Sequence, residues 1–279
     1  TDYPFDNNDL DSGTSKVHSV LKDNAGNLWI AIYQKGVMMI PAQPNSCKYI
    51  GYKSINKNII GSNCITSLCR DHEGILWIGT DNDGIYGITT ELKQRVHYAP
   101  HDSPFSVPST VFGLYEDSER NLWFGSYTNG LGRLDKKTGQ CSYLQNLTDK
   151  HGNRIQRVYD LVEDQDKRLW IATMGAGLFY YDLKTGQSVY DPKFNAATEK
   201  YKWISCLLYA GDNHLYVGTY DGIRCIDLST DDFKTEEILS RHIIHSLYED
   251  PQGNIWIGSS DGLAEWNPQT RQLKTYTTA

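Results

Sequence analysis

Three tyrosines stand at the same distance behind apolar segments and are accompanied by polar side chains. Tyr33, Tyr127 and Tyr220 each follow an aromatic residue by four positions. A tyrosine ring offers a flat face that stacks on a sugar ring, and nearby amides and carboxylates bond sugar hydroxyls. These residue types predict a binding site for a neutral or basic oligosaccharide. Its polar candidates are Lys35, Asp81, Asn82, Asn129, Asp221 and Asp261.

The same residues have a second explanation. Asp-Gly and Asn-Gly pairs are common in tight turns, and the tyrosines could pack at a rim. For each residue both interpretations stay open at this point.

Four basic side chains extend the candidate set. Arg154 and Arg157 could bind a sulfated or uronic-acid sugar through paired hydrogen bonds. His18 and His245 occupy equivalent positions near the two ends of the chain, where they could bind a ligand or serve as structural histidines. No third ligand accompanies them at a useful spacing, so neither a metal site nor a cofactor is predicted. The sequence has no HExxH, nucleophile elbow or Gly-rich phosphate loop, and we predict no catalytic residue.

These candidates sit in an internal repeat. An aromatic residue within a segment of the type Asn-Leu-Trp-Ile-Gly recurs at intervals of 40 to 48 residues over the whole chain. Repeats of this period are typical of β-propellers. The six recurring residues are Trp29, Trp77, Trp123, Trp170, Tyr216 and Trp256. We predict that they are structural anchors, wedged between neighbouring blades.

Each repeat has the pattern of four short strands joined by turns. The predicted fold is all-β, a propeller of six four-stranded antiparallel blades that is either a six-bladed ring or a portion of a seven-bladed one. We expect residues 1–16 to form an entry segment that could come from a preceding blade. The predicted blades of this single domain cover residues 17–56, 65–103, 111–150, 158–195, 204–240 and 244–279. The loops after the second and fourth strands lie on one face, where ligands are expected.

Composition narrows the possible partners. The net charge is −7 and the isoelectric point is near 5.6, which argues against nucleic acid. No stretch of about 18 apolar residues occurs, so a membrane is expected to be reached only through a longer parent chain. The six cysteines lack CxxC spacing, which favours buried thiols over bridges but leaves disulfides open.

The motif Leu-x-x-Asp-x-x-Gly-Asn-Leu-Trp-Ile-Gly-Thr, with the later Gly-Leu and Asp-x-x-Thr-Gly, resembles the two-component regulator propeller repeat. Residues 247–262 and 114–139 carry it most fully. The resemblance implies an extracytoplasmic, periplasmic sensor of a hybrid histidine kinase of Bacteroidetes. Such a sensor recognises oligosaccharides derived from polysaccharides, without catalysis, and relays the signal to the cytoplasmic kinase. It also implies neighbouring propeller and β-sandwich domains as partners, and a homodimer.

The family's sensors usually have two seven-bladed propellers, whereas this sequence has six units. Two other functions remain open. One is a metal-dependent lyase or lactonase, which similar propellers form, and the other is a scaffold for protein–protein interaction.

Overall fold

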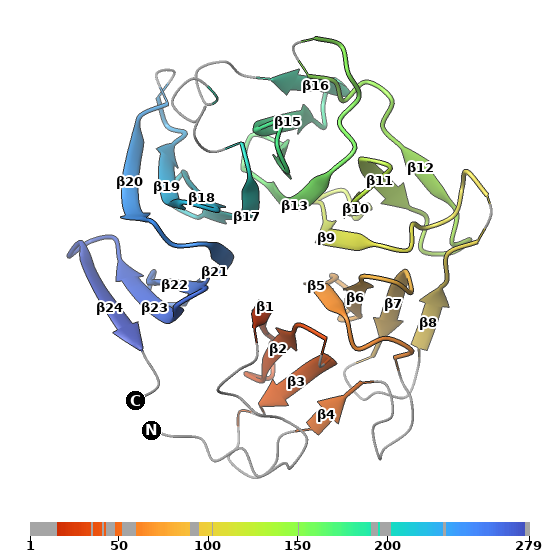
Figure 1. The fold of residues 1–279 in the computed structure, drawn as a ribbon, viewed down its shortest axis with the longest axis horizontal. Helices are drawn as coiled ribbons and strands as arrows, with labels where there is room; N and C mark the ends of the chain where they lie inside the picture. The colour runs from red at the N-terminus through yellow and green to blue at the C-terminus, as the bar shows by residue number, and fades with distance from the viewer. Residues whose placement is uncertain are drawn as a thin grey trace.

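The computed structural model shows six four-stranded antiparallel sheets arranged radially around a central channel (Figure 1). It describes residues 16–34, 36–40, 42, 48–51, 60–89, 95–101, 103–149, 151–190, 195, 202–230 and 233–276. In every sheet the strands follow chain order from the innermost to the outermost. Among the described residues no helix is long and apolar enough to cross a bilayer.

The first three blades hold twelve strands. Blade 1 comprises β1 (Val17–Lys22), β2 (Leu28–Ile32), β3 (Gly36–Ile40) and β4 (Lys48–Ile50). Blade 2 comprises β5 (Ile65–Arg70), β6 (Leu76–Thr80), β7 (Ile85–Ile88) and β8 (Arg95–Tyr98). Blade 3 comprises β9 (Val111–Glu116), β10 (Leu122–Ser126), β11 (Leu131–Leu134) and β12 (Cys141–Tyr143).

The last three blades repeat this order. Blade 4 comprises β13 (Val158–Glu163), β14 (Arg168–Thr173), β15 (Leu178–Asp182) and β16 (Gln187–Tyr190). Blade 5 comprises β17 (Ile204–Ala210), β18 (His214–Thr219), β19 (Gly222–Asp227) and β20 (Thr235–Ser240). Blade 6 comprises β21 (Ile244–Glu249), β22 (Ile255–Ser259), β23 (Gly262–Asn267) and β24 (Gln272–Tyr276).

The ring closes at the channel, because β1 contacts β21 as it contacts β5. The prediction of a six-bladed all-β propeller is therefore confirmed. The predicted entry segment lies outside the described residues, apart from Lys16.

An aspartate holds the anchor tryptophan in five of the blades. The indole Nε1 donates to a carboxylate Oδ2 at 2.7–3.0 Å in Asp23–Trp29, Asp71–Trp77, Asp117–Trp123, Asp164–Trp170 and Asp250–Trp256. The other oxygen accepts two backbone N–H groups of the turn between the first two strands, as Asp117 does from Glu119 and Asn121. Blade 5 lacks both partners, having Ala210 and Tyr216 in their places. Asp and Trp therefore form one structural unit.

These hydrogen bonds also affect the pKa of the aspartate, as Asp71 shows. Burial opposes the ionisation of Asp71, but bonds from the Trp77 indole, the Ile75 amide and Lys136 outweigh it and lower its pKa. The Lys136 ammonium lies 3.2 Å from Asp71 and 2.7 Å from Glu116. Blades 2 and 3 are thus joined by a charged link beside the apolar one.

The core lies between the blades. Five apolar clusters each join two neighbouring blades, from blades 1 and 2 to blades 5 and 6. The anchors of the first five blades are only 0–4% exposed. Packing of each indole or phenol against the next sheet buries apolar faces that a single sheet leaves in water. Their predicted role as blade anchors agrees with this burial.

The junction between blades 6 and 1 is built differently. Trp256 is only partly buried, β24 is exposed along its length, and among the described residues no apolar cluster joins these two blades. In blades 3, 4 and 6 a glutamate at the end of the inner strand accepts an N–H of the preceding blade, as Glu116 does from His72 at 2.6 Å. At this junction the equivalent positions are Lys22 and Pro251, which offer neither the acceptor nor the N–H. The ring is held here mainly by its inner strands.

Replacement of the anchors tests this difference. Trp170→Ala removes a fully buried side chain and should lower the free energy of unfolding by about 3–5 kcal/mol. Trp256→Ala should cost less than half as much, since that ring is partly in water already. Urea unfolding followed by tryptophan fluorescence measures both. Equal losses in the two variants would show that blade 6 packs on blade 1 as tightly as the other blades pack.

Candidate functional site

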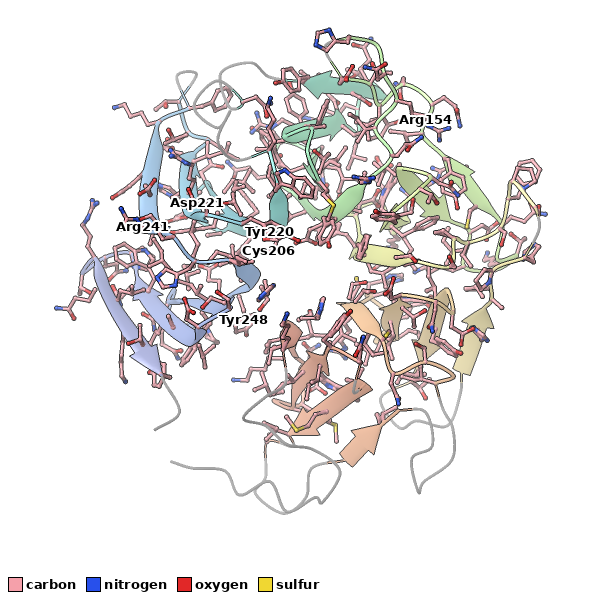
Figure 2. All side chains as sticks on the ribbon, in the orientation of Figure 1. Arg154, Cys206, Tyr220, Asp221, Arg241 and Tyr248 are labelled. Atoms are coloured by element: carbon pink, nitrogen blue, oxygen red, sulfur yellow. The ribbon has the colours of Figure 1, made fainter. Side chains whose placement is uncertain are left out.

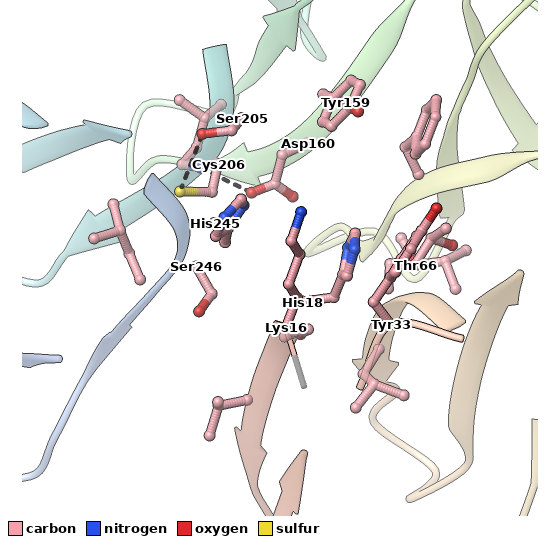
Figure 3. A pocket seen from close by; sticks show the side chains of 18 of the residues that line it. Lys16, His18, Tyr33, Thr66, Tyr159, Asp160, Ser205, Cys206, His245 and Ser246 are labelled. Carbon is pink, nitrogen blue, oxygen red and sulfur yellow. Dashed lines mark hydrogen bonds between the residues drawn. The ribbon is translucent and has the colours of Figure 1, made fainter. Parts of the chain in front are cut away.

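A β-bulge interrupts the innermost strand of every blade near its start. The pairing of the first two strands shifts register between residues 17 and 19 in blade 1, and at the matching place in the other five. A bulge bends a strand and redirects a side chain. The residues at this position are His18, Thr66, Phe112, Tyr159, Ser205 and His245. All six line one cavity of about 300 Å³ in the channel (Figure 3).

Aromatic rings surround the mouth of this cavity. Tyr33, Tyr127 and Tyr220 follow the second strands of blades 1, 3 and 5, and their side chains are 37–42% exposed. Tyr33 and Tyr220 line the cavity itself. Trp203, 47% exposed, lies with its ring 5.9 Å from that of Tyr220. Exposed aromatic faces grouped in this way are surfaces for a flat, partly apolar ligand.

Two further ring contacts order this surface. Phe112 stacks on Tyr159 at 4.3 Å and meets the edge of Tyr127 at 6.0 Å. The Arg157 guanidinium lies 5.0 Å from the centre of the Tyr127 ring. Arg157 is thus held beside the mouth by a cation–π contact. These ring contacts were not predicted from the sequence.

Several polar candidates serve the turns that carry them. Asn129 and Asp221 donate their backbone N–H to Ser126 and Thr219, whose hydroxyls in turn bond the carbonyl of the next glycine. The Asn82 Oδ1 accepts a hydrogen bond from Ser62 at 2.6 Å. These contacts support the turn explanation. Asp81 differs from these residues. Its carboxylate, on the same loop face, makes no hydrogen bond or ion pair to a described residue.

The remaining candidates are spread over the face. Asp261 pairs with His242, and Arg154 donates to the Asn129 carbonyl at 3.1 Å. Figure 2 shows Tyr220 near the centre of the ring and Arg154 toward its outer edge. Lys35 lies outside the described residues. The structure therefore brings His18, His245, Tyr33 and Tyr220 together in the cavity and places the other described candidates around or away from it.

Three nitrogen-bearing side chains meet inside the cavity. The rings of His18 and His245 lie 6.4 Å apart, and Lys16 lines the same space. Burial, followed by the nearby charges of His245 and Lys16, lowers the pKa of His18 to about 4. Burial and Lys16 also lower the pKa of His245. Both imidazoles are therefore neutral near pH 7.

Asp160 is a partly buried carboxyl in the cavity wall that sequence reasoning missed. Its oxygens accept the backbone N–H of Leu161 at 2.9 Å and of Leu207 at 2.8 Å, which links blades 4 and 5. Burial raises its pKa to about 6, although the two N–H groups favour the charged form. The matching residues in the other blades are Ser19, Ser67, Gly113, Cys206 and Ser246. The sequence does contain a signal that could have found Asp160, because it is a carboxyl residue at a position where the other blades have small residues.

The described residues contain no group of three His, Cys, Asp or Glu side chains placed to hold a metal ion. Five cysteines, at positions 64, 69, 141, 206 and 225, are free thiols, and Cys47 lies outside the described residues. Burial raises the pKa of Cys69 and Cys141 to about 12, so these thiols stay protonated and unreactive.

The low pKa of His18 makes the free energy of unfolding depend on pH. The unfolded chain binds a proton at this residue near pH 6.5, and the folded chain binds it only near pH 4. Its stabilising contribution is therefore present above pH 6.5 and is lost as the pH falls toward 4. Asp160, whose folded pKa is raised, acts in the opposite direction over nearly the same range.

We expect the substitution His18→Asn to remove the pH-dependent contribution of His18 to stability. The stability difference between the wild type and the variant should shift in the variant's favour by roughly 1–3 kcal/mol between pH 7 and pH 4.5. Urea denaturation at several pH values measures it, with the exposed His151→Asn as control. A difference that stays constant with pH would mean that His18 titrates normally.

Comparison with known proteins identifies the repeat. The family model described as two component regulator propeller matches residues 59–82, 107–128, 154–175 and 238–261. The matches fall at the junctions that precede blades 2, 3, 4 and 6 and run through their anchor tryptophans. No curated protein matches the chain.

Solved structures share the fold at low sequence identity. The extracellular domains of two putative systems of B. thetaiotaomicron, the one component system BT4673 and the hybrid two component system BT3049, each align with a TM-score of 0.73 and 18% identity. The alignments cover 96% and 97% of this chain but only 37% and 36% of those proteins, so the chain spans little more than a third of their length. Virginiamycin B lyase from Staphylococcus aureus aligns with a TM-score of 0.69 and 13% identity, over 94% of this chain and 84% of the lyase. Four of the six repeats therefore match the two component regulator propeller, and the fold is shared with these solved structures.

Proposed function

We propose that the chain is the extracytoplasmic, ligand-binding part of a two-component sensor, and that it binds an oligosaccharide without chemical turnover. The site is the aromatic mouth of the channel, where exposed tyrosine faces stand around a cavity lined by both polar and apolar side chains. Aromatic faces stack on sugar rings while hydroxyl, amide and imidazole groups bond the sugar hydroxyls. This combination is the observation that carries the proposal.

The biological setting is part of the same proposal. The extracellular domains that share the fold belong to putative one- and two-component systems. By analogy, this propeller lies in the periplasm of a bacterium such as a member of the Bacteroidetes. It belongs to a longer chain with further propeller or sandwich domains and a cytoplasmic histidine kinase, and it can pair with a second copy.

Signal relay needs no catalysis by this domain. A ligand shifts an equilibrium between two arrangements of a receptor by its difference in affinity for them. Binding at the channel mouth contacts inner strands of several blades at once, so it can favour one arrangement of neighbouring blades or domains.

One observation favours a different function, namely a lyase. Virginiamycin B lyase has a similar fold, and two histidines face the channel here. Against this stand the missing third metal ligand among the described residues and the Lys16 cation beside both imidazoles. Chromatography of every bound oligosaccharide after incubation separates the functions, because a lyase changes its ligand and a sensor returns it intact.

Truncation of the mouth tyrosines tests the proposed site. Tyr127→Ala and Tyr220→Ala should each weaken oligosaccharide binding by roughly 3- to 30-fold, through loss of one stacking face. A glycan library screened by thermal shift, followed by calorimetry, supplies the ligand and the affinities. The matched control is Tyr276→Ala, an equally exposed tyrosine on the outer strand of blade 6. Binding that responds only to the control, or a library without any binder, would refute the proposal.

A further inference from the structure

We propose that the ligand of the channel mouth carries an anionic group, a carboxylate or a sulfate ester, which Lys16, His18 and His245 bind inside the cavity. This inference rests on the proposed function, because it names the class of sugar that the site takes. Its evidence is the cluster of nitrogen donors, which is independent of the aromatic mouth.

The cluster is formed by the two ends of the chain. Lys16 and His18 project from the start of β1, and His245 projects from β21 in the neighbouring blade 6 (Figure 3). Both histidines are the bulge residues of their strands, so the backbone turns their rings into the channel. The Lys16 charge is close enough to lower the pKa of both rings.

These donors have no protein acceptor among the described residues. Neither imidazole makes a hydrogen bond or ion pair there; their contacts are ring contacts, His18 with Tyr33 at 5.1 Å and with His245. The Lys16 ammonium likewise pairs with no described carboxylate. The carboxylate that lines the cavity, Asp160, is already engaged by the amides of Leu161 and Leu207.

An anion satisfies this arrangement better than other ligands. An ammonium and two imidazole N–H groups are all donors to one oxyanion, and charge-assisted bonds are about twice as strong as neutral ones. A neutral hydroxyl forms no ion pair with the ammonium, and Lys16 repels a metal cation. Because the whole chain is acidic, with a net charge of −7, the Lys16 ammonium at this cavity is a local feature and not part of a general basic surface.

The Tyr33 ring beside the cluster indicates that the anionic group belongs to a sugar. Tyr33 stacks on His18, so the donors stand directly beside one aromatic face of the mouth. A pyranose ring stacked on Tyr33 places a ring carboxylate or sulfate within reach of the cluster. The sequence pointed to Arg154 and Arg157 for such a group. The structure instead bonds Arg154 to a backbone carbonyl and holds Arg157 over Tyr127.

Matched ligand pairs test the inference on the whole chain. Each acidic oligosaccharide is compared with its neutral form: oligogalacturonates with their methyl esters, and sulfated oligosaccharides with their desulfated products. Calorimetry should show that an acidic form binds roughly 10- to 100-fold more tightly than its neutral partner. The uronate and sulfate arms decide which anion the site prefers.

Charge variants locate the effect. Lys16→Gln should abolish most of the acidic preference, whereas Lys16→Arg should keep it to within about threefold, since the charge remains. Lys184→Gln is the matched control, because it removes an exposed lysine from a turn on the opposite face. An acidic preference that survives Lys16→Gln would place the anion elsewhere and overturn the assignment.

A simpler probe separates this inference from the proposed function. Sodium sulfate, compared with sodium chloride of equal ionic strength, should shift the imidazole NMR signals of His18 and His245, assigned with His18→Asn and His245→Asn. Shifts without any oligosaccharide binding would refute the sensor of sugars but keep the anion site. Equal binding of acidic and neutral sugars, with no sulfate-specific shift, would refute the anion site and leave the proposed function standing.

Discussion

In five of the six blades, one aspartate carboxylate joins the turn after the innermost strand to the indole of the next strand. The carboxylate accepts the turn amides with one oxygen and the indole N–H with the other. It thereby fixes the turn and the orientation of the ring that packs on the next blade. The indole can be buried only because its polar N–H has this acceptor. Blade 5 has lost both members together, which fits a single unit with two parts.

This unit leaves the start of the inner strand free to vary. The anchors and turns lie near the far end of that strand, and the bulge near its beginning has a different residue type in most blades, from Thr66 to Tyr159. Residues that the scaffold does not require are thus gathered around one cavity. Between blades 6 and 1 the described residues form neither an apolar cluster nor a glutamate link, but the inner strands still meet.

Much of the fold could be predicted from the sequence, because local rules determine it. Trp29 and its equivalents recur with the period of a blade, and the Gly and Asp signals locate the turns. The Asp–Trp hydrogen bond was not predicted, although both residues were in the repeat, because periodicity shows that positions matter but not which atoms meet. Burial of Trp256 was overestimated for a similar reason, since its exposure depends on a neighbour that the repeat cannot describe.

The site was predictable only in part. The repeats showed that His18 and His245 occupy equivalent positions. Their rings lie close together only because the ring closes between blades 6 and 1, and closure is a property of the whole chain. Lys16 lies before the first strand and had no repeat partner to mark it. Asn82 and Asn129 were chosen for their chemistry, yet their turns explain their contacts.

The most direct test of the central unit is a double-mutant cycle in blade 3 with Asp117→Ala, Trp123→Phe and the combination. Removal of the carboxylate leaves buried donors without an acceptor, so each single change should destabilise the fold. The account predicts a coupling free energy of about 1–3 kcal/mol from urea unfolding, with the double variant losing clearly less than the two single losses together. Strictly additive losses would contradict it, because the aspartate and the tryptophan would then stabilise the propeller independently.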